Sequence, residues 1–290
     1  MKIIRYFIEF IIVIIFFAIF KIIGPRQSSN LGGRIGKYFG PFFRKKEIIK
    51  KNISLVFPNI SEKEMNKLIN KMWENIGRVF AEYVHLNKFS IYNKKKIKIN
   101  FTSKTNIEKL NNYNKPIVFF SGHFSNFELM GVCLKELSFN IGVLYRPLNN
   151  FFLNPIWELI KVNSSSTLIE KGSKGSKKLI KHIKQNNSLG LLVDQRLSSS
   201  IHVPFFGKPA TTTTAPAKLA IKHSALLIPM FIKRVNEIEF EFFIDEPLVI
   251  NKTNDYKKDI FNITKSMNKK IEEFIIRDPA HWLWSHDRWK

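Results

Sequence analysis

The sequence predicts an α/β protein: a single main domain with a largely parallel central sheet flanked by helices, preceded by an N-terminal membrane helix and a helical arm. An almost wholly apolar N-terminal stretch, an amphipathic segment after it, and short apolar runs alternating with polar stretches from about residue 97 support this class. We therefore expect a membrane anchor at 1–25, a helical arm at 26–96 and the main domain at 97–290.

The N-terminal segment has the length and composition of a membrane helix. Residues 6–23 are apolar except for Glu9 and Lys21, and a span of about 20 apolar residues crosses a bilayer. A cleaved signal peptide is the alternative, but Gly-Pro-Arg at 24–26 is no small-residue cleavage site. More lysines and arginines follow the segment than precede it, a bias that keeps the following chain in the cytoplasm. We therefore expect a membrane-anchored protein whose main domain lies on the cytoplasmic face.

The helical arm contains one well-defined helix start. Residues 26–60 read as short helical pieces around glycines, whereas Ser61 and Glu64 form the pattern of a capping box. Apolar residues then recur at i, i+3, i+4 and i+7 through residue 84, so one face of this helix should pack on the core rather than lie on a membrane surface.

Buried strands and helices alternate through the main domain. Two polar segments at 174–184 and 215–223 are expected to be helices. Five short apolar runs are expected to be strands: 117–120, 141–145, 189–193, 226–232 and 240–244.

Charge and cysteine content restrict the partners. The formal net charge of +24 suits nucleic acid, an acidic membrane, a phosphorylated lipid or an acidic carrier protein, although AT-rich coding would also enrich lysine. We find neither an RNA-binding signature nor a glycine-rich phosphate loop, so we expect no nucleic acid partner. The single cysteine, Cys133, excludes an intrachain disulfide and a zinc site of several thiolates.

His123 and Glu128 are the main candidates for chemistry. In one continuous helix, residues five apart lie about 140° apart around the axis, so we expect His123 to precede a helix that begins at Ser125. Glu128 in its first turn could then accept the Nδ1 hydrogen of His123 and leave Nε2 as a general base. The alternative is that Ser125 and Glu128 form only a capping box. The carboxyl edge of a parallel sheet is a usual place for an active site, which favours chemistry.

Six sequence blocks carry a family resemblance. Gly122-His123 through Glu128 matches the H-x4-D/E motif of glycerolipid-type acyltransferases, and the whole set resembles the lipid A late-acyltransferase branch, the lauroyl and myristoyl transferases. The blocks, in order, are SGHFSNFE at 121–128, YRP at 145–147, VDQR at 193–196, VPFFG at 203–207, ATT at 210–212 and WLWSHDRWK at 282–290.

The resemblance implies a function in lipopolysaccharide biosynthesis. Residues 97–290 would form an acyltransferase domain that moves a fatty acyl chain from an acyl carrier protein thioester to a hydroxyl of a Kdo-bearing lipid A precursor. A thioester is already activated, so no cofactor or metal is expected, and the hydroxyl would attack directly with His123 as general base. His123 and Glu128 would be the catalytic pair. The expected substrate-binding residues are Arg146, Asp194, Ser125 and Asn126.

Two of these assignments have structural alternatives. Arg146 could hold a phosphate or the developing oxyanion, because guanidinium binds such groups in a fixed fork, or it could be a surface arginine. Asp194 could act in the site or be an ordinary residue of a turn after a strand. The C-terminal tryptophans Trp282, Trp284 and Trp289 could lie at the headgroup level of a membrane or pack against the sheet, and we place them outside the catalytic set.

Other functions remain as alternatives. The same histidine and carboxylate would serve a membrane acyltransferase that acts on a lysophospholipid or another glycolipid, and a lipid-binding relative could keep the fold without activity. The presence of both His123 and Glu128 favours an active enzyme. The length of the transferred chain is not predicted.

Overall fold

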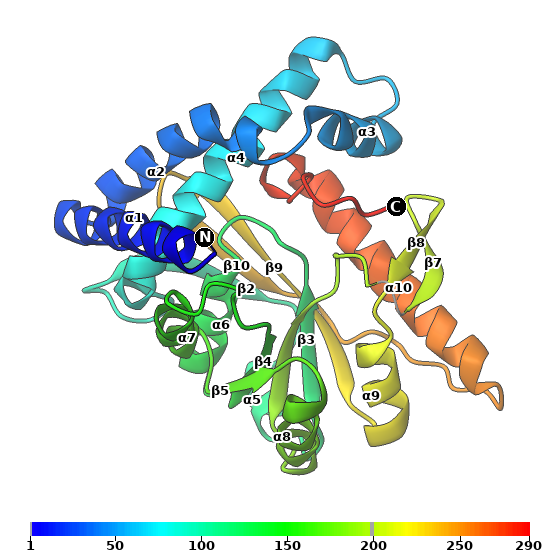
Figure 1. Ribbon diagram of the computed structural model, residues 1–290. Helices are drawn as coiled ribbons and strands as arrows, with labels where there is room; N and C mark the ends of the chain where they lie inside the picture. The colour runs from blue at the N-terminus through cyan, green and yellow to red at the C-terminus, as the bar shows by residue number, and fades with distance from the viewer. Residues whose placement is uncertain (1, 198–199) are drawn as a thin grey trace.

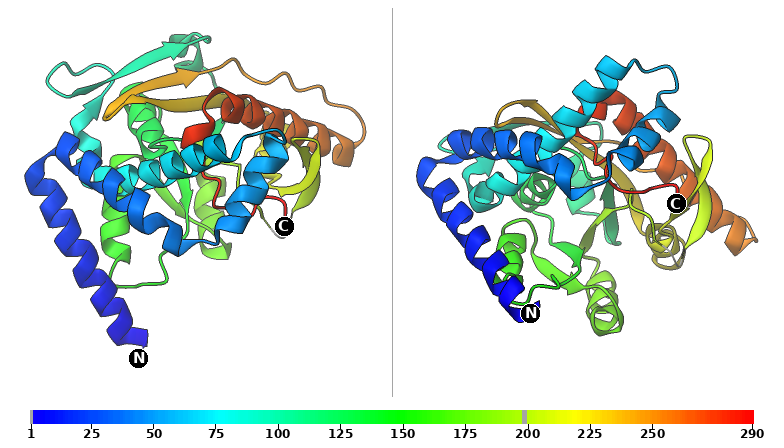
Figure 2. Two further views of the ribbon diagram at one scale, coloured as in Figure 1. Left: turned by 90° about the horizontal axis from the view of Figure 1, so that it is seen from above. Right: turned by 45° about the horizontal axis from the view of Figure 1, so that its top comes forward.

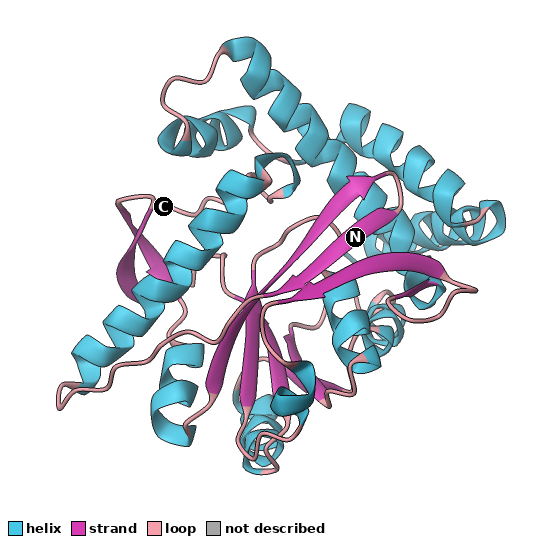
Figure 3. Cartoon of the chain, turned by 180° about the vertical axis from the view of Figure 1, so that it is seen from behind, coloured by secondary structure: helices cyan, strands magenta, loops and turns pink. Residues whose placement is uncertain are grey.

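The centre of the molecule is an eight-stranded sheet with the order β1-β2-β10-β9-β3-β6-β4-β5 (Figures 1 and 3). The computed structural model describes residues 2–197 and 200–290. The strands of this sheet are β1 (Phe89–Ser90), β2 (Ile97–Ser103), β3 (Ile117–Ser121), β4 (Ile141–Tyr145), β5 (Thr167–Glu170), β6 (Ser188–Leu192), β9 (Leu226–Asn236) and β10 (Glu239–Ile244). A separate antiparallel hairpin is formed by β7 (Ile201–Phe205) and β8 (Lys208–Thr212).

Neighbouring strands of the large sheet run parallel except β9 and β10. The predicted α/β class with a largely parallel sheet is confirmed, and all five predicted strands are present. The strand predicted at 240–244 is antiparallel to its predecessor because only residues 237–238 connect the two, and a parallel neighbour requires a crossover of about a dozen residues.

Helices cover both faces of the sheet. Alternate residues of β3 face opposite sides, so Val118 and Phe120 join one hydrophobic cluster while Ile117 and Phe119 join the other. The first cluster includes residues of α8 (Ser173–Lys184), α9 (Ala215–His223) and α10 (Tyr256–Arg277). The second includes residues of α5 (Ile107–Asn111), α6 (Glu128–Glu136) and α7 (Asn154–Asn163).

The arm consists of helices that pack on one another and on the sheet (Figure 1). Ser61 caps α4 through the predicted capping box with Glu64, and the apolar face of α4 joins the first cluster, as predicted. The anchor and the arm contain α1 (Lys2–Ile23), α2 (Pro25–Phe39), the 3-10 helix η1 (Gly40–Phe43), α3 (Lys46–Val56), α4 (Glu62–Glu82) and the 3-10 helix η2 (Tyr83–Lys88). One further 3-10 helix, η3 (Pro279–His281), follows α10 in the main domain.

The glycines of the arm permit a close helix crossing. Residues 26–60 form short helical pieces as predicted, namely α2, η1 and α3, and three of the glycines lie inside α2, which lies along α4. A Cβ atom on Gly36 would lie 2.3 Å from the carbonyl oxygen of Trp73, and one on Gly77 would lie 2.1 Å from that of Gly32. Glycine lowers the stability of a helix relative to alanine, but here its missing side chain lets the backbones of α2 and α4 touch.

Helix α1 has one packed side and one bare side. It is long and apolar enough to cross a membrane. On the packed side, Phe20 is buried and its carbonyl lies 2.9 Å from His85 Nε2, while Asn150 Nδ2 donates to the carbonyl of Tyr6 at 2.9 Å. The bare side exposes a row of isoleucines: Ile3, Ile4, Ile8, Ile11, Ile12, Ile15, Ile19 and Ile22. This row is the part of the helix that suits lipid.

The close crossing of α2 and α4 predicts a stability difference between two glycines. Gly77→Ala is expected to destabilise the protein by about 1–3 kcal/mol, the range for overpacked cores, because the new atom meets backbone. Gly33→Ala is the matched control on α2, since its Cβ would meet only the side chains of Arg78 and Glu74 at 3.0–3.1 Å. Melting of the detergent-solubilised protein, followed by circular dichroism, measures both. Equal melting temperatures for the two variants would contradict the close crossing.

Candidate active site

His123 lies in the loop between β3 and α6, at the carboxyl edge of the sheet. Helix α6 begins at Glu128 rather than at Ser125 as predicted, because Ser125 has a left-handed backbone with φ of 44°. The capping box of Ser125 with Glu128 therefore does not form. The Ser125 hydroxyl instead accepts a hydrogen bond from the backbone N–H of Arg234 at 2.9 Å.

Asp194 holds the imidazole of His123. It follows β6, the neighbour of β3 in the sheet. His123 Nδ1 lies 2.7 Å from Asp194 Oδ1, and the backbone N–H of His123 donates to Oδ2 at 2.8 Å. Trp282 Nε1 donates to the same Oδ2 at 2.8 Å. Because a carboxylate only accepts, Nδ1 carries the hydrogen and Nε2 keeps its lone pair, 3.3 Å from the amide nitrogen of Gln195.

Glu128 has different partners from those predicted. Its Oε1 forms an ion pair with Lys161, and its Oε2 accepts from the Ser164 hydroxyl at 2.8 Å. Both partners come from α7 or the residue after it. The expected hydrogen bond from His123 Nδ1 to Glu128 is therefore replaced by one to Asp194, because Glu128 is the first residue of α6 and its side chain turns toward α7.

The ionised form of Asp194 is strongly favoured. Burial raises its pKa, but the neighbouring His123 imidazole and the hydrogen bonds from His123 and Trp282 outweigh burial and lower the pKa to about 2. Gly122 leaves room for this cluster, since a Cβ there would lie 2.9 Å from Asp194 Oδ2 and 2.7 Å from the Phe124 ring. The carboxylate is thus charged throughout the physiological pH range and can stabilise an imidazolium.

A cavity of about 640 Å³ opens beside His123 and Glu128. Cationic side chains line part of it: Arg146, Lys161, Lys171 and Arg196. Its apolar lining comes from α6 and from strands β4, β6 and β9: Met130, Leu134, Ile141, Val143, Leu192 and Met230. The cavity therefore combines a charged part with an apolar part that lies between α6 and the sheet.

The structure brings together four of the six predicted site residues. His123, Glu128 and Arg146 line the cavity, and Asp194 contacts His123. Arg146 follows β4 and is exposed, which suits a residue that meets a ligand at the opening.

Ser125 and Asn126, the other two, face the arm instead of the cavity. Both are buried. Asn126 Nδ2 donates to Glu82 at 2.8 Å, and Glu82 also accepts two bonds from the Arg234 guanidinium, at 2.7 and 3.0 Å. Asn75 Nδ2 donates to the carbonyl of Ser125 at 3.2 Å. The hydrogen bonds of both residues therefore hold the loop of His123 against the arm and β9.

The sequence did not predict the positions of three residues in this arrangement: Trp282, Glu82 and Arg234. Trp282 lies in the last of the six sequence blocks, for which packing against the sheet or contact with a membrane was expected. Glu82 and Arg234 each stand beside apolar residues, at the end of a helix and in a strand, and a charge in an apolar run is a recognisable sign of a buried pair. In the part of the chain that the structure describes, no group of three or more His, Cys, Asp or Glu could hold a metal ion.

Fold and site together define a class of protein. A histidine hydrogen-bonded to a buried carboxylate beside a partly apolar cavity, with an apolar helix at the N-terminus, is the arrangement expected of an enzyme that acts on a lipid-like substrate.

Comparison with known proteins identifies the family. The family described as bacterial lipid A biosynthesis acyltransferase matches residues 1–290, so the chain belongs to that family and is an acyltransferase, as the resemblance implied. It is 26% identical over 270 residues to the lipid A biosynthesis palmitoleoyltransferase of Escherichia coli, covering 90% of this chain and 84% of the relative. It is 26% identical over 268 residues to the lauroyltransferase of the same organism, with the same coverage. A lipid A biosynthesis acyltransferase of Haemophilus influenzae is 22% identical over 276 residues, covering 93% of this chain and 84% of the relative.

The low pKa of Asp194 predicts a pH-dependent contribution to stability. Its pKa of about 2 lies below the ordinary 3.8, so the ionised carboxylate stabilises the folded state above about pH 4, and this contribution is lost as the pH falls toward 2. The difference is worth on the order of 2 kcal/mol. Wild type and Asp194→Asn should therefore differ by about that much in urea unfolding at pH 6 and converge near pH 2. A difference that stays constant over this range would contradict the low pKa.

Proposed function

We propose that this protein transfers a fatty acyl chain from an acyl carrier protein thioester to a hydroxyl of a Kdo-bearing lipid A precursor, with His123 as general base. The observation that carries the proposal is the His123–Asp194 pair, which leaves Nε2 as the basic nitrogen beside the cavity. Family membership supports acyl transfer in lipid A biosynthesis.

The proton would move through one nitrogen in both directions. As the acceptor hydroxyl attacks the thioester carbon, its proton passes to His123 Nε2, and Asp194 stabilises the resulting imidazolium. The tetrahedral intermediate then expels the thiolate, which takes the proton back from Nε2. An ester and a free thiol result, the imidazole is neutral again, and no covalent enzyme intermediate is formed.

Cationic side chains around the cavity would bind the negatively charged groups of the substrate and stabilise the developing oxyanion. Arg146 would hold a phosphate of the substrate or the developing oxyanion, because its guanidinium can make two parallel hydrogen bonds. Glu128 keeps Lys161 in place at the cavity wall through their ion pair. We therefore assign Glu128 to the catalytic site through Lys161 and the position of α7, and Asp194 to the orientation of His123.

The apolar part of the cavity would take the acyl chain. Two relatives are named for palmitoleate and laurate, and the space between α6 and the sheet suits such a chain. The net charge of +24 suits both an acidic carrier protein and a phosphorylated lipid. We further propose that α1 anchors the protein in the inner membrane with the catalytic domain on the cytoplasmic face, as the distribution of basic residues indicates.

Two carboxylate variants separate the roles of Asp194 and Glu128. Asp194→Asn should lower turnover by about 10⁴-fold, the scale known for a triad in which asparagine stabilises the wrong histidine tautomer. His123→Ala should abolish transfer with circular dichroism unchanged. Glu128→Gln is the matched control at a carboxylate that does not touch His123, and it should lower turnover far less while it loosens the binding of substrate. If Glu128→Gln instead cost as much as Asp194→Asn, Glu128 would be the residue that orients the base.

A product assay tests the acceptor and the donor. Purified enzyme is incubated with acyl carrier protein carrying laurate, myristate or palmitoleate, together with a Kdo-bearing lipid A precursor, a lysophospholipid or another glycolipid. Mass spectrometry should find the acyl chain on the lipid A precursor. Exclusive acylation of the lysophospholipid would overturn the acceptor, and binding without any product would indicate an inactive relative.

A further inference from the structure

The turn between α2 and α3 exposes aromatic side chains to an unusual degree. Phe42 and Phe43 in η1 are 86% and 82% exposed, and Tyr38 and Phe39 just before them are also exposed. Large apolar side chains that gather at one exposed place mark a site of protein or membrane contact. They do not serve the core of this domain, which is built elsewhere.

The fold holds this turn in a fixed position. Gly40 is buried against the indole of Trp73, so that a Cβ there would lie 2.4 Å from the ring. On the other side of the turn, Arg44 Nε donates to the carbonyl of Ser285 at 2.8 Å. The backbone is thus tied down at both ends, and Phe42 and Phe43 project outward from a supported turn.

Basic residues surround the aromatic ones. All four that flank the turn are exposed: Lys37, Arg44, Lys45 and Lys46. Aromatic rings next to lysine and arginine are the chemistry of a membrane interface, where the rings lie at headgroup level and the cations meet anionic lipid. These side chains therefore favour contact with an anionic surface over contact with an uncharged protein surface.

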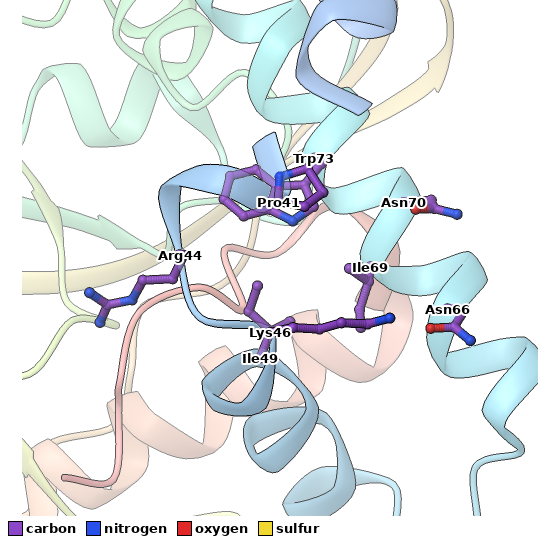
Figure 4. A pocket seen from close by; sticks show the side chains of 8 residues that line it. All are labelled: Pro41, Arg44, Lys46, Ile49, Asn66, Ile69, Asn70 and Trp73. Atoms are coloured by element: carbon purple, nitrogen blue, oxygen red, sulfur yellow. The ribbon is translucent and has the colours of Figure 1, made fainter. Parts of the chain in front are cut away.

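A small cavity of about 270 Å³ lies beside the turn. Its lining residues are Pro41, Arg44, Lys46, Ile49, Asn66, Ile69, Asn70 and Trp73 (Figure 4). Apolar side chains and two cations thus continue from the turn into this hollow, where two amides join them.

The turn faces the same side of the molecule as the N-terminal end of α1 (Figure 2, left). The bare isoleucine row of α1 suits a position in lipid. Phe151, which is exposed and packs against Tyr6 of α1, continues the apolar surface on this side. A bilayer that receives α1 would therefore also lie close to Phe42 and Phe43.

We infer that residues 37–46 form a second membrane-contact element, the aromatic–basic turn, which docks on the surface of an anionic phospholipid bilayer with Phe42 and Phe43 at headgroup level. Two separate attachments, α1 and the aromatic–basic turn, prevent the body from rotating freely about a single anchor. This inference needs only membrane association and holds whatever the acceptor of the acyl chain is.

Site-specific labelling of the full-length chain tests the inference without any activity. Phe42→Cys carries an environment-sensitive dye, and the native Cys133 does not compete because it is buried. The matched control is Val249→Cys, another highly exposed apolar position, on the connection between β10 and α10. Each protein is reconstituted in vesicles of phosphatidylethanolamine with phosphatidylglycerol, with and without bromine-labelled lipid as quencher.

The dye at position 42 should emit at shorter wavelength, gain several-fold in intensity and be quenched by the labelled lipid, while the dye at 249 should stay water-like. A water-like signal at 42 would overturn the inference. A blue-shifted dye emission at 42 in detergent that increases with protein concentration would also overturn the inference, because it would show that a second copy of the chain covers the turn. Lys37→Gln with Lys45→Gln should reduce the signal at 42 in anionic vesicles.

A second measurement uses the enzyme reaction. Phe42→Ser with Phe43→Ser should lower the rate several-fold when the acceptor is embedded in vesicles and leave the rate on detergent-dispersed acceptor unchanged. Val249→Ser should change neither. This rate measurement depends on the proposed function, whereas the labelling experiment does not. A failure of the proposed function can therefore be told from a failure of the membrane-contact inference. Equal rates of the double variant and wild type on vesicles would contradict the inference.

Discussion

The ion pair of Glu82 and Arg234 is the interaction on which the position of the loop of His123 depends. Both side chains are almost completely buried, and two charges out of water are tolerated only when the partners satisfy one another and their remaining hydrogen bonds. Glu82 does so with Arg234, Ser29 and Asn126. Because these residues come from α2, α4, β9 and the loop after His123, the arm and the catalytic domain share one polar centre.

The strained backbone of Ser125 shows that this polar centre holds the loop firmly in one conformation. A left-handed conformation is costly for serine, yet its N–H, carbonyl and hydroxyl all have partners, in His281, Asn75 and Arg234. The strain delays the start of α6 until Glu128. As a result, His123 is free to face Asp194 across the adjacent ends of β3 and β6, although the two residues are 71 positions apart in the chain.

Patterns that depend on near neighbours could be predicted from the sequence. The cap at Ser61, the strand 141–145 and the helix 215–223 are confirmed because local periodicity and capping decide them. The partner of His123 could not be derived in this way. Glu128 and Asp194 are both carboxylates near it, and the choice rests on where α6 begins, which contacts from Asn75 and Arg234 determine. The close crossing of α2 and α4 could not be predicted for a similar reason, since the packing role of the α2 glycines is not visible until the partner helix is known.

The contact between Trp282 and Asp194 also bears on how the enzyme is made. The two residues are 88 positions apart, so the carboxylate leaves the ribosome long before the indole that holds it. Helix α1 leaves before both of them and can meet a membrane while translation continues. The loop of His123 therefore gains its full set of contacts only after the segment around Trp282 has been made.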